Sequence, residues 1–178
     1  MSNKFNIAIV GATGNVGREI LQILKQRNFP SDNIYLLASS RSKGKKIEFK
    51  EQEIVVEDLA DFDFSKVKIA LFSPGGLVSA EYAPKAAKKG CIVIDNTSHF
   101  RMDEDVPLIV PEVNANILQD YFDDENRSNI IANPNCSTIQ LVVAIKPIHD
   151  RAIINRIVIS TYQSVSGAGK EAMDELWE

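Results

Sequence analysis

The stretch FNIAIVGATGNVGREIL, residues 5–21, runs from a short apolar segment through three regularly spaced glycines into a helical pattern. The apolar segment is typical of a strand buried on both faces of a parallel sheet. Gly11, Gly14 and Gly17 follow it, and glycines at this spacing let the backbone approach the pyrophosphate of a dinucleotide. The stretch therefore predicts a strand, a phosphate-binding turn and a helix; a tight turn without any ligand is the alternative interpretation.

The rest of the chain continues to alternate between the two patterns. Apolar segments predict strands at residues 33–39, 45–59, 67–73, 91–96, 129–133 and 152–163. Helical patterns occupy residues 79–90 and 114–122, begin at Cys136, and begin again near residue 169. Strand–helix alternation with right-handed crossovers predicts an α/β fold with a doubly wound sheet, whose ligands bind beyond the carboxyl ends of the strands.

Composition narrows the class of protein. The chain has 178 residues, 44% of them hydrophobic, and a net charge of −4. This argues for a globular protein and against nucleic acid or an anionic membrane as the main partner. Its two cysteines do not make a disulfide framework, and we see neither a signal peptide nor an apolar run long enough to span a membrane. We expect a cytoplasmic protein that needs no metal.

The end of the second predicted strand indicates which dinucleotide binds. An NAD site usually places an acidic residue there, against the ribose 2′-hydroxyl. This chain instead reads LASSRSKGKK at residues 37–46. The hydroxyls of Ser39 and Ser42 and the guanidinium of Arg41 suit a 2′-phosphate, which favours NADP.

Cys136 stands in NPNCST, residues 133–138, where a helical pattern begins. A helix start presents unpaired N–H groups and a positive dipole end, and both favour a thiolate. A small apolar residue near a helix cap is the alternative. Beside a nicotinamide cofactor, a thiolate can convert an aldehyde into a thioester, from which phosphate releases an acyl phosphate; the reverse reaction reduces an acyl phosphate.

Six segments together resemble one family along essentially the whole chain. They read VGATGNVGRE, ASSRSKGK, FSPGG, VIDNTSHFRMDEDVPLIVPEVN, NPNCST and YQSVSGAGKEAMDEL. They are similar to the aspartate-β-semialdehyde dehydrogenase family, which is related to glyceraldehyde-3-phosphate dehydrogenase. The resemblance implies an oxidoreductase that interconverts aspartate β-semialdehyde and aspartyl-β-phosphate with NADP, in the biosynthesis of diaminopimelate, lysine, threonine and methionine. It also implies a homodimer or homotetramer.

The resemblance further implies a domain division and substrate-site residues. Residues 1–134 would form a Rossmann-like NADP-binding domain, and residues 135–178 the beginning of an α+β domain for catalysis and dimerisation. Cys136 matches the thioester nucleophile, and Gln163 matches a glutamine that orients the substrate. Arg101 matches the arginine that binds the phosphate; pairing with a neighbouring carboxylate at the surface is its alternative role.

Cofactor contacts are implied in the same way. The residues matching the pyrophosphate turn, the 2′-phosphate site and the nicotinamide end are Gly11, Thr13, Gly14, Asn15, Val16, Gly17, Ser39, Arg41, Ser42, Ser166 and Gly167.

The chain departs from the family in its length. Family members are about twice as long, and the pattern here stops inside a helix without a cap. The family's general-base histidine is expected beyond residue 178, and neither His99 nor His149 lies in its motif. We therefore expect no turnover from these 178 residues alone. The alternatives are an N-acetyl-glutamyl-phosphate reductase, whose cysteine motif usually reads Asn-Pro-Gly-Cys, a non-catalytic NADP-binding remnant, and, with less support, a thiol redox sensor.

Overall fold

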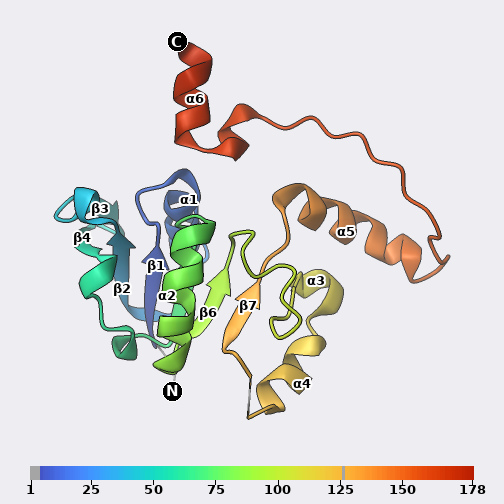
Figure 1. Ribbon diagram of the computed structural model, residues 1–178, viewed down its shortest axis with the longest axis horizontal. Coiled ribbons are helices and arrows are strands. Elements are labelled where there is room, and N and C mark those ends of the chain that lie inside the picture. Colours follow the sequence, from blue (N-terminus) through green and yellow to red (C-terminus); the bar gives the residue numbers. More distant parts are fainter. Residues whose placement is uncertain (1–4, 126) are drawn as a thin grey trace.

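The computed structural model describes residues 5–125 and 127–178 (Figure 1). Within these ranges one sheet has the strand order β3-β4-β2-β1-β5-β6-β7. The strands are β1 Phe5–Val10, β2 Ser31–Ala38, β3 Lys46–Phe49, β4 Gln52–Asp58, β5 Ile69–Phe72, β6 Ile92–Asp95 and β7 Ile130–Ala132. All neighbouring pairs are parallel except β3 with β4. The order runs outward in both directions from β1, which confirms the doubly wound prediction.

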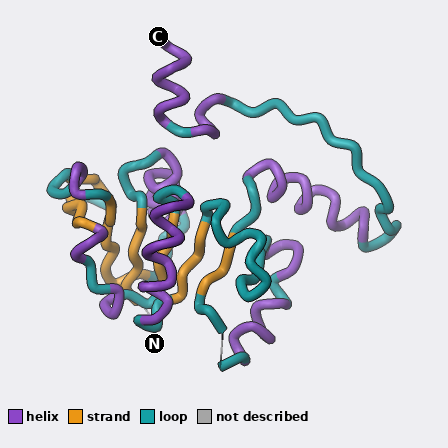
Figure 2. Tube along the Cα trace, viewed as in Figure 1, coloured by secondary structure: helices purple, strands orange, loops and turns teal. Residues whose placement is uncertain are grey.

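Helices pack against both faces of this sheet (Figure 2). The described helices are α1 Asn15–Gln26, α2 Gly76–Lys88, α3 Pro111–Asn114, α4 Ile117–Asp123, α5 Cys136–His149 and α6 Lys170–Trp177. Of these, α1 contributes to the core on one face and α2 to the core on the other. Short 3₁₀ turns lie at Ser40–Ser42, Leu59–Asp61, Phe64–Lys66 and Val165–Ala168.

The core forms one layer on each side of the strands. On one face, Leu21 and Leu24 of α1 pack in a cluster with Ile9 and Leu36 of the sheet. On the other face, the small residues of α2 lie in a cluster with larger strand residues; this cluster includes Ala83, Ala86, Ala70, Phe72 and Val93. Burying a large apolar side chain is worth about 1.5–3 kcal/mol, so these two layers hold the strand ends in fixed positions.

The glycine turn lies where β1, β5 and α1 meet. Gly11 has φ +84°, and a Cβ there would lie 2.6 Å from the carbonyl oxygen of Ser73, just after β5. A Cβ at Gly17 would lie 2.3 Å from the carbonyl oxygen of Gly11. At Gly14 the nearest atom would be 3.4 Å away, an ordinary contact. Two of the three glycines therefore bring backbones together, and the third leaves the start of α1 open.

The prediction of a strand at residues 152–163 is wrong. This segment is extended but forms no ladder with any described strand, and Ile153 and Val158 are 77% and 81% exposed. An alternating apolar pattern makes a strand only where a partner offers main-chain hydrogen bonds. No such partner lies beside this segment in the part of the chain that the structure describes.

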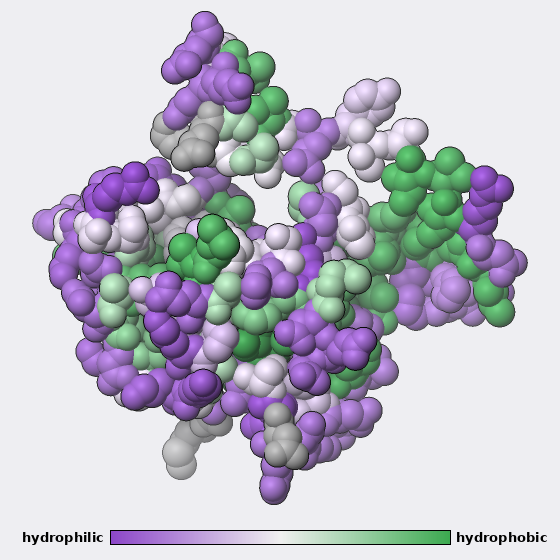
Figure 3. Space-filling view, in the orientation of Figure 1, coloured by the Kyte–Doolittle hydropathy of each residue, from purple (hydrophilic) through white to green (hydrophobic). Residues whose placement is uncertain are grey.

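Helix α5 also keeps its apolar side chains accessible. It is rich in Ile, Leu and Val, yet none of its residues is buried. Apolar side chains gather over this helix on the right of Figure 3. Together with residues 152–163, α5 therefore forms an apolar surface that the described residues do not cover. None of the described helices has the length and apolar content that a membrane crossing requires.

Candidate functional site

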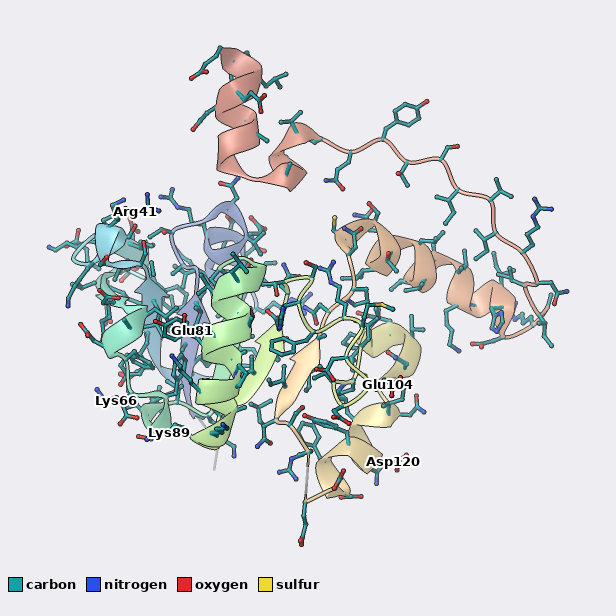
Figure 4. The ribbon with its side chains drawn as sticks, viewed as in Figure 1. Arg41, Lys66, Glu81, Lys89, Glu104 and Asp120 are labelled. Carbon is teal, nitrogen blue, oxygen red and sulfur yellow. The ribbon has the colours of Figure 1, made fainter. Side chains whose placement is uncertain are left out.

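One cavity of about 530 Å³ opens at the carboxyl edge of the sheet, next to the glycine turn. Its wall contains the predicted cofactor residues Gly11, Thr13, Gly14, Ser39 and Arg41. Figure 4 shows Arg41 at the same edge of the molecule as the loop that leads into α1. The folded chain thus brings together residues from the first and second βα connections, as a dinucleotide site requires.

The remaining residues predicted for the phosphate turn lie beside this cavity. Asn15, Val16 and Gly17 form the first turn of α1, and the N-cap, Gly14, has no side chain to bond the free N–H groups. Ser42 ends the Ser40–Ser42 turn, where its N–H donates to the Ser39 carbonyl at 2.8 Å. An uncapped helix start next to a roomy cavity fits a pyrophosphate, so the residues present fit the dinucleotide that the sequence predicts.

Asp58 also lines the cavity, and sequence reasoning missed it. It ends β4, which lies parallel beside β2, so the carboxyl ends of both strands reach the same edge. One oxygen of Asp58 accepts the Ala60 N–H at 3.1 Å. The signal was present in the sequence, because an acidic residue ends the apolar segment there, but the second predicted strand is where an NAD site usually places its acid.

Arg101 connects two loops at the same edge of the sheet. Its Nε donates to the carbonyl of Asn133 at 2.9 Å, and its Nη2 donates to the carbonyl of Asn96 at 3.1 Å. Asp103 is a neighbouring carboxylate with which Arg101 could have paired, but it accepts the N–H of Asp105 at 3.0 Å. The guanidinium therefore bridges the loop after β6 and the turn that leads to Cys136.

Cys136 is the first residue of α5, as the sequence predicts. The side chain of the N-cap, Asn135, accepts the Ser137 N–H at 3.0 Å and so fixes the start of the helix. The Cys136 Sγ is exposed and lies 3.9 Å from Oε1 of Gln163, a long and weak contact. The two residues predicted to act on the substrate are thus neighbours, although 27 positions separate them in the sequence.

A second cavity, of about 640 Å³, lies beside the start of α5. One side of its wall comes from the first two turns of α5 and the other from the extended segment; the wall contains Asn135, Ser137, Thr138, Gln140, Leu141, Ile159, Thr161, Tyr162 and Gln163. Polar groups from both segments face this space, which suits a small polar ligand next to the thiol.

The segment predicted to reach the nicotinamide end follows directly. Ser166 and Gly167 lie in the Val165–Ala168 turn, and a Cβ on Gly167 would lie 2.4 Å from Nε2 of Gln163. Beyond the turn, the sulfur of Met173 in α6 lies 3.7 Å from Nδ2 of Asn15 at the start of α1. The chain thus returns to the glycine turn, as the position of α6 in Figure 1 also shows.

The two cysteines have opposite environments. Cys91 is fully buried, and this burial raises the pKa of its thiol to about 12, with nearby Lys68 opposing the shift. Cys136 is exposed at a helix start. No group of three or more potential metal ligands gathers within the described residues.

Comparison with known proteins identifies the family. A family model described as semialdehyde dehydrogenase, NAD binding domain, matches residues 6–121. A second, described as semialdehyde dehydrogenase, dimerisation domain, matches residues 145–178. The chain belongs to the semialdehyde dehydrogenase family. This confirms the resemblance found in the sequence.

Relatives and solved structures of semialdehyde dehydrogenases agree with this assignment. The chain is 58% identical over 176 residues to an aspartate-semialdehyde dehydrogenase from Legionella pneumophila, covering 99% of this chain and 50% of the relative. It matches a crystal structure of aspartate semialdehyde dehydrogenase II from Vibrio cholerae, complexed with ASA, at 56% identity and TM-score 0.93, covering 99% of this chain and 51% of that one.

A more distant structure, aspartate semialdehyde dehydrogenase with NADP from Candida albicans, is 26% identical with TM-score 0.69, covering 85% of this chain and 48% of that one. The chain spans about half the length of the curated relatives it matches.

We predict that iodoacetamide alkylates Cys136 much faster than Cys91. At pH 8 a thiol with a pKa of about 12 is ionised in about one molecule in 10⁴, and only the thiolate reacts. The measurement is a time course of alkylation, read by peptide mass spectrometry.

The control is the same time course in urea, where burial is lost and the two cysteines should react at similar rates. Folded chain in which Cys91 is modified first would contradict the assigned environments.

Proposed function

We propose that this chain provides the NADP-binding site and the reactive thiol of an aspartate-semialdehyde dehydrogenase, which interconverts aspartate β-semialdehyde and aspartyl-β-phosphate. One observation carries the proposal: the dinucleotide-type cavity and the loop that leads to Cys136 both follow parallel strands of one sheet and so share its carboxyl edge. Relatives that are more than half identical to the chain bear the name of this enzyme.

The cofactor proposal rests on the first cavity. Gly11 and Gly14 offer bare backbone to a pyrophosphate, while Ser39 and Arg41 in the same wall offer a hydroxyl and a guanidinium to a 2′-phosphate. The planar guanidinium suits a phosphate, which supports NADP over NAD. When bound, the nicotinamide would exchange the two electrons that separate an aldehyde from an acyl group.

The thiol would act through a covalent step on the acyl phosphate. The Cys136 thiolate attacks the carbonyl carbon, a carbon–sulfur bond forms, and the carbon–oxygen bond to phosphate breaks as phosphate leaves with the electron pair. The product of this step is a thioester on Cys136, which the redox step then converts to the aldehyde.

Two further side chains would orient the substrate. Arg101 donates from Nε and Nη2 to the carbonyls of the two loops. Within the described residues its Nη1 makes no hydrogen bond, so it could donate to the phosphate. Gln163 lies against the thiol and lines the second cavity, where its amide can bond a polar substrate group. Ser166 and Gly167 adjoin Gln163 and would line the nicotinamide side.

Neither described histidine forms a hydrogen bond with Cys136 or Gln163. The ring of His149 accepts the Ile154 N–H at 3.3 Å, and it ends the helix that Cys136 begins, about 20 Å away at the α-helical rise. The ring of His99 packs edge-on against Phe100. We therefore propose that these 178 residues bind cofactor but do not turn over, since a base contributes about 10²–10⁴-fold to the rate.

Assembly would use the apolar surface of α5 and residues 152–163. The dimerisation family model matches residues 145–178, which include part of this surface. A homodimer or homotetramer would cover side chains that otherwise remain in water. We place the domain boundary between residues 134 and 135, immediately before the cap of α5. A reduced thiol at Cys136 also suits a reducing compartment such as the cytoplasm.

The cofactor proposal predicts a selective effect of Arg41→Ala. Binding of NADPH should weaken by about 1.5–3 kcal/mol, the value of a hydrogen bond to a charged group, while NADH binding stays nearly unchanged. The measurement is calorimetric titration of each cofactor.

The matched control is Lys43→Ala, since Lys43 lies in the same loop but pairs with Asp61 at 3.0 Å. Equal losses for NADPH and NADH in the Arg41 variant would mean that Arg41 does not bind the 2′-phosphate, and would contradict the proposal.

The reaction is tested on the whole natural protein that carries this chain. We expect NADPH oxidation with aspartyl-β-phosphate, no oxidation with N-acetyl-glutamyl phosphate, and loss of activity in Cys136→Ser. Activity with N-acetyl-glutamyl phosphate alone would establish the alternative reductase. Cofactor binding without activity toward either acyl phosphate would establish the non-catalytic remnant.

A further inference from the structure

A cluster of three buried polar side chains lies under the candidate site. Ser79 and Asp95 are fully buried and Thr97 nearly so. The Ser79 hydroxyl donates to Oδ1 of Asp95 at 2.7 Å, and the Thr97 hydroxyl donates to Oδ2 at 2.7 Å. The N–H of Thr97 also donates to Oδ1, at 3.1 Å. The carboxylate of Asp95 therefore joins α2 to the loop that follows β6.

A buried carboxylate of this kind fixes geometry. Removing it from water is costly, and only its three hydrogen bonds offset that cost. Any movement of the loop that breaks one of these bonds leaves a buried polar atom without a partner, which is penalised strongly in a medium of low dielectric constant. One further hydrogen bond joins the loop to this cluster: the His99 N–H donates to the Thr97 hydroxyl at 3.3 Å.

This cluster connects directly to the arginine of the site. Asn96, the residue after Asp95, provides one of the two carbonyls that hold Arg101. Asn133 provides the other, and its own N–H donates to the main-chain carbonyl of Asp95 at 2.8 Å. Both acceptors of the guanidinium are thus attached to Asp95, one through the chain and one through a hydrogen bond.

We propose that Asp95 is a positioning residue: by fixing residues 96–101 through Ser79 and Thr97, it holds the Arg101 guanidinium in place beside the turn that leads to Cys136. The phosphate-binding consequence rests on the function proposed above for Arg101; the positioning itself does not. Asp95 touches neither substrate nor cofactor in this account, and its effect reaches the site only through Arg101 and Asn133.

The test follows the Arg101 Nε–H by nitrogen-15 NMR in the 178-residue chain, with Arg101→Lys identifying the signal. In the unaltered chain this proton should exchange slowly with water, because it is bonded to the Asn133 carbonyl. Asp95→Asn and Ser79→Ala, which each disturb only part of the cluster, should raise its exchange rate about 10-fold, the effect of losing one hydrogen bond. Asp95→Ala should raise it further.

Asp63→Ala is the matched control. Asp63 accepts the N–H and the hydroxyl of Ser65, the same local pattern that Asp95 makes with Thr97, but it lies in an exposed turn. It should leave the exchange of Arg101 unchanged. Unchanged exchange in folded Asp95→Asn and Ser79→Ala would overturn the proposal, even if Asp95→Ala fails to fold.

A titration with inorganic phosphate, followed by the same NMR signal, distinguishes the positioning role of Asp95 from the proposed phosphate-binding role of Arg101. If phosphate shifts the Arg101 signal, Asp95→Asn should weaken that binding about 10-fold while leaving NADPH binding unchanged. If phosphate shifts nothing in the unaltered chain while Asp95→Asn still frees the Nε–H, the positioning role stands and the phosphate role of Arg101 fails. Equal weakening of phosphate and NADPH binding would reduce Asp95 to a general stabiliser and overturn the proposal.

Discussion

The absence of a side chain at Gly11 and Gly17 lets three segments approach one another more closely than any other residue allows. Any Cβ at either position would lie within 3 Å of a main-chain carbonyl oxygen. This contact fixes the end of β1 against the end of β5 and the start of α1 against the turn. The cavity opens beside this close approach, and the open start of α1, Ser39 and Arg41 lie around it.

The chemical side of the site depends on hydrogen bonds and not on close packing. β6 and β7 end beside each other, and the loops that follow them are joined by Arg101 and by the main chain of Asn133. A buried carboxylate, Asp95, anchors one of those loops. The two halves of the site thus occupy one sheet edge but have different physical supports, so a substitution can impair one half without the other.

Local patterns in the sequence predicted most of the fold. The buried strand at Phe5–Val10, the glycine turn and the helix that begins at Cys136 each follow from residues that are neighbours in the chain. The conformation of residues 152–163 was predicted wrongly, because a strand needs a partner and the apolar pattern does not specify one. Contacts between distant segments were equally hidden: the joint role of Ser79 and Asp95 depends on α2 crossing over the end of β6.

Some residues of the candidate site could be assigned only from the family resemblance. Gln163 has no local feature that marks it, and its place near Cys136 is known because the extended segment returns toward α5. Asp58 shows the opposite case, since an acid that ends a parallel strand could have been found from the sequence once β4 was placed beside β2. The sequence pattern alone was therefore enough to propose the thiol and the cofactor turn. The residues around them could be found only from the structure or the family resemblance.

We propose that Cys136 carries the acyl group between the two substrates. Denaturing mass spectrometry of the whole natural protein, after mixing with aspartyl-β-phosphate in the absence of NADPH, tests this role most directly. We expect an aspartyl adduct on the peptide that contains Cys136, and both hydroxylamine and added NADPH should remove it. An unmodified Cys136 in a protein that still oxidises NADPH with this substrate, or an adduct located on Cys91, would contradict it.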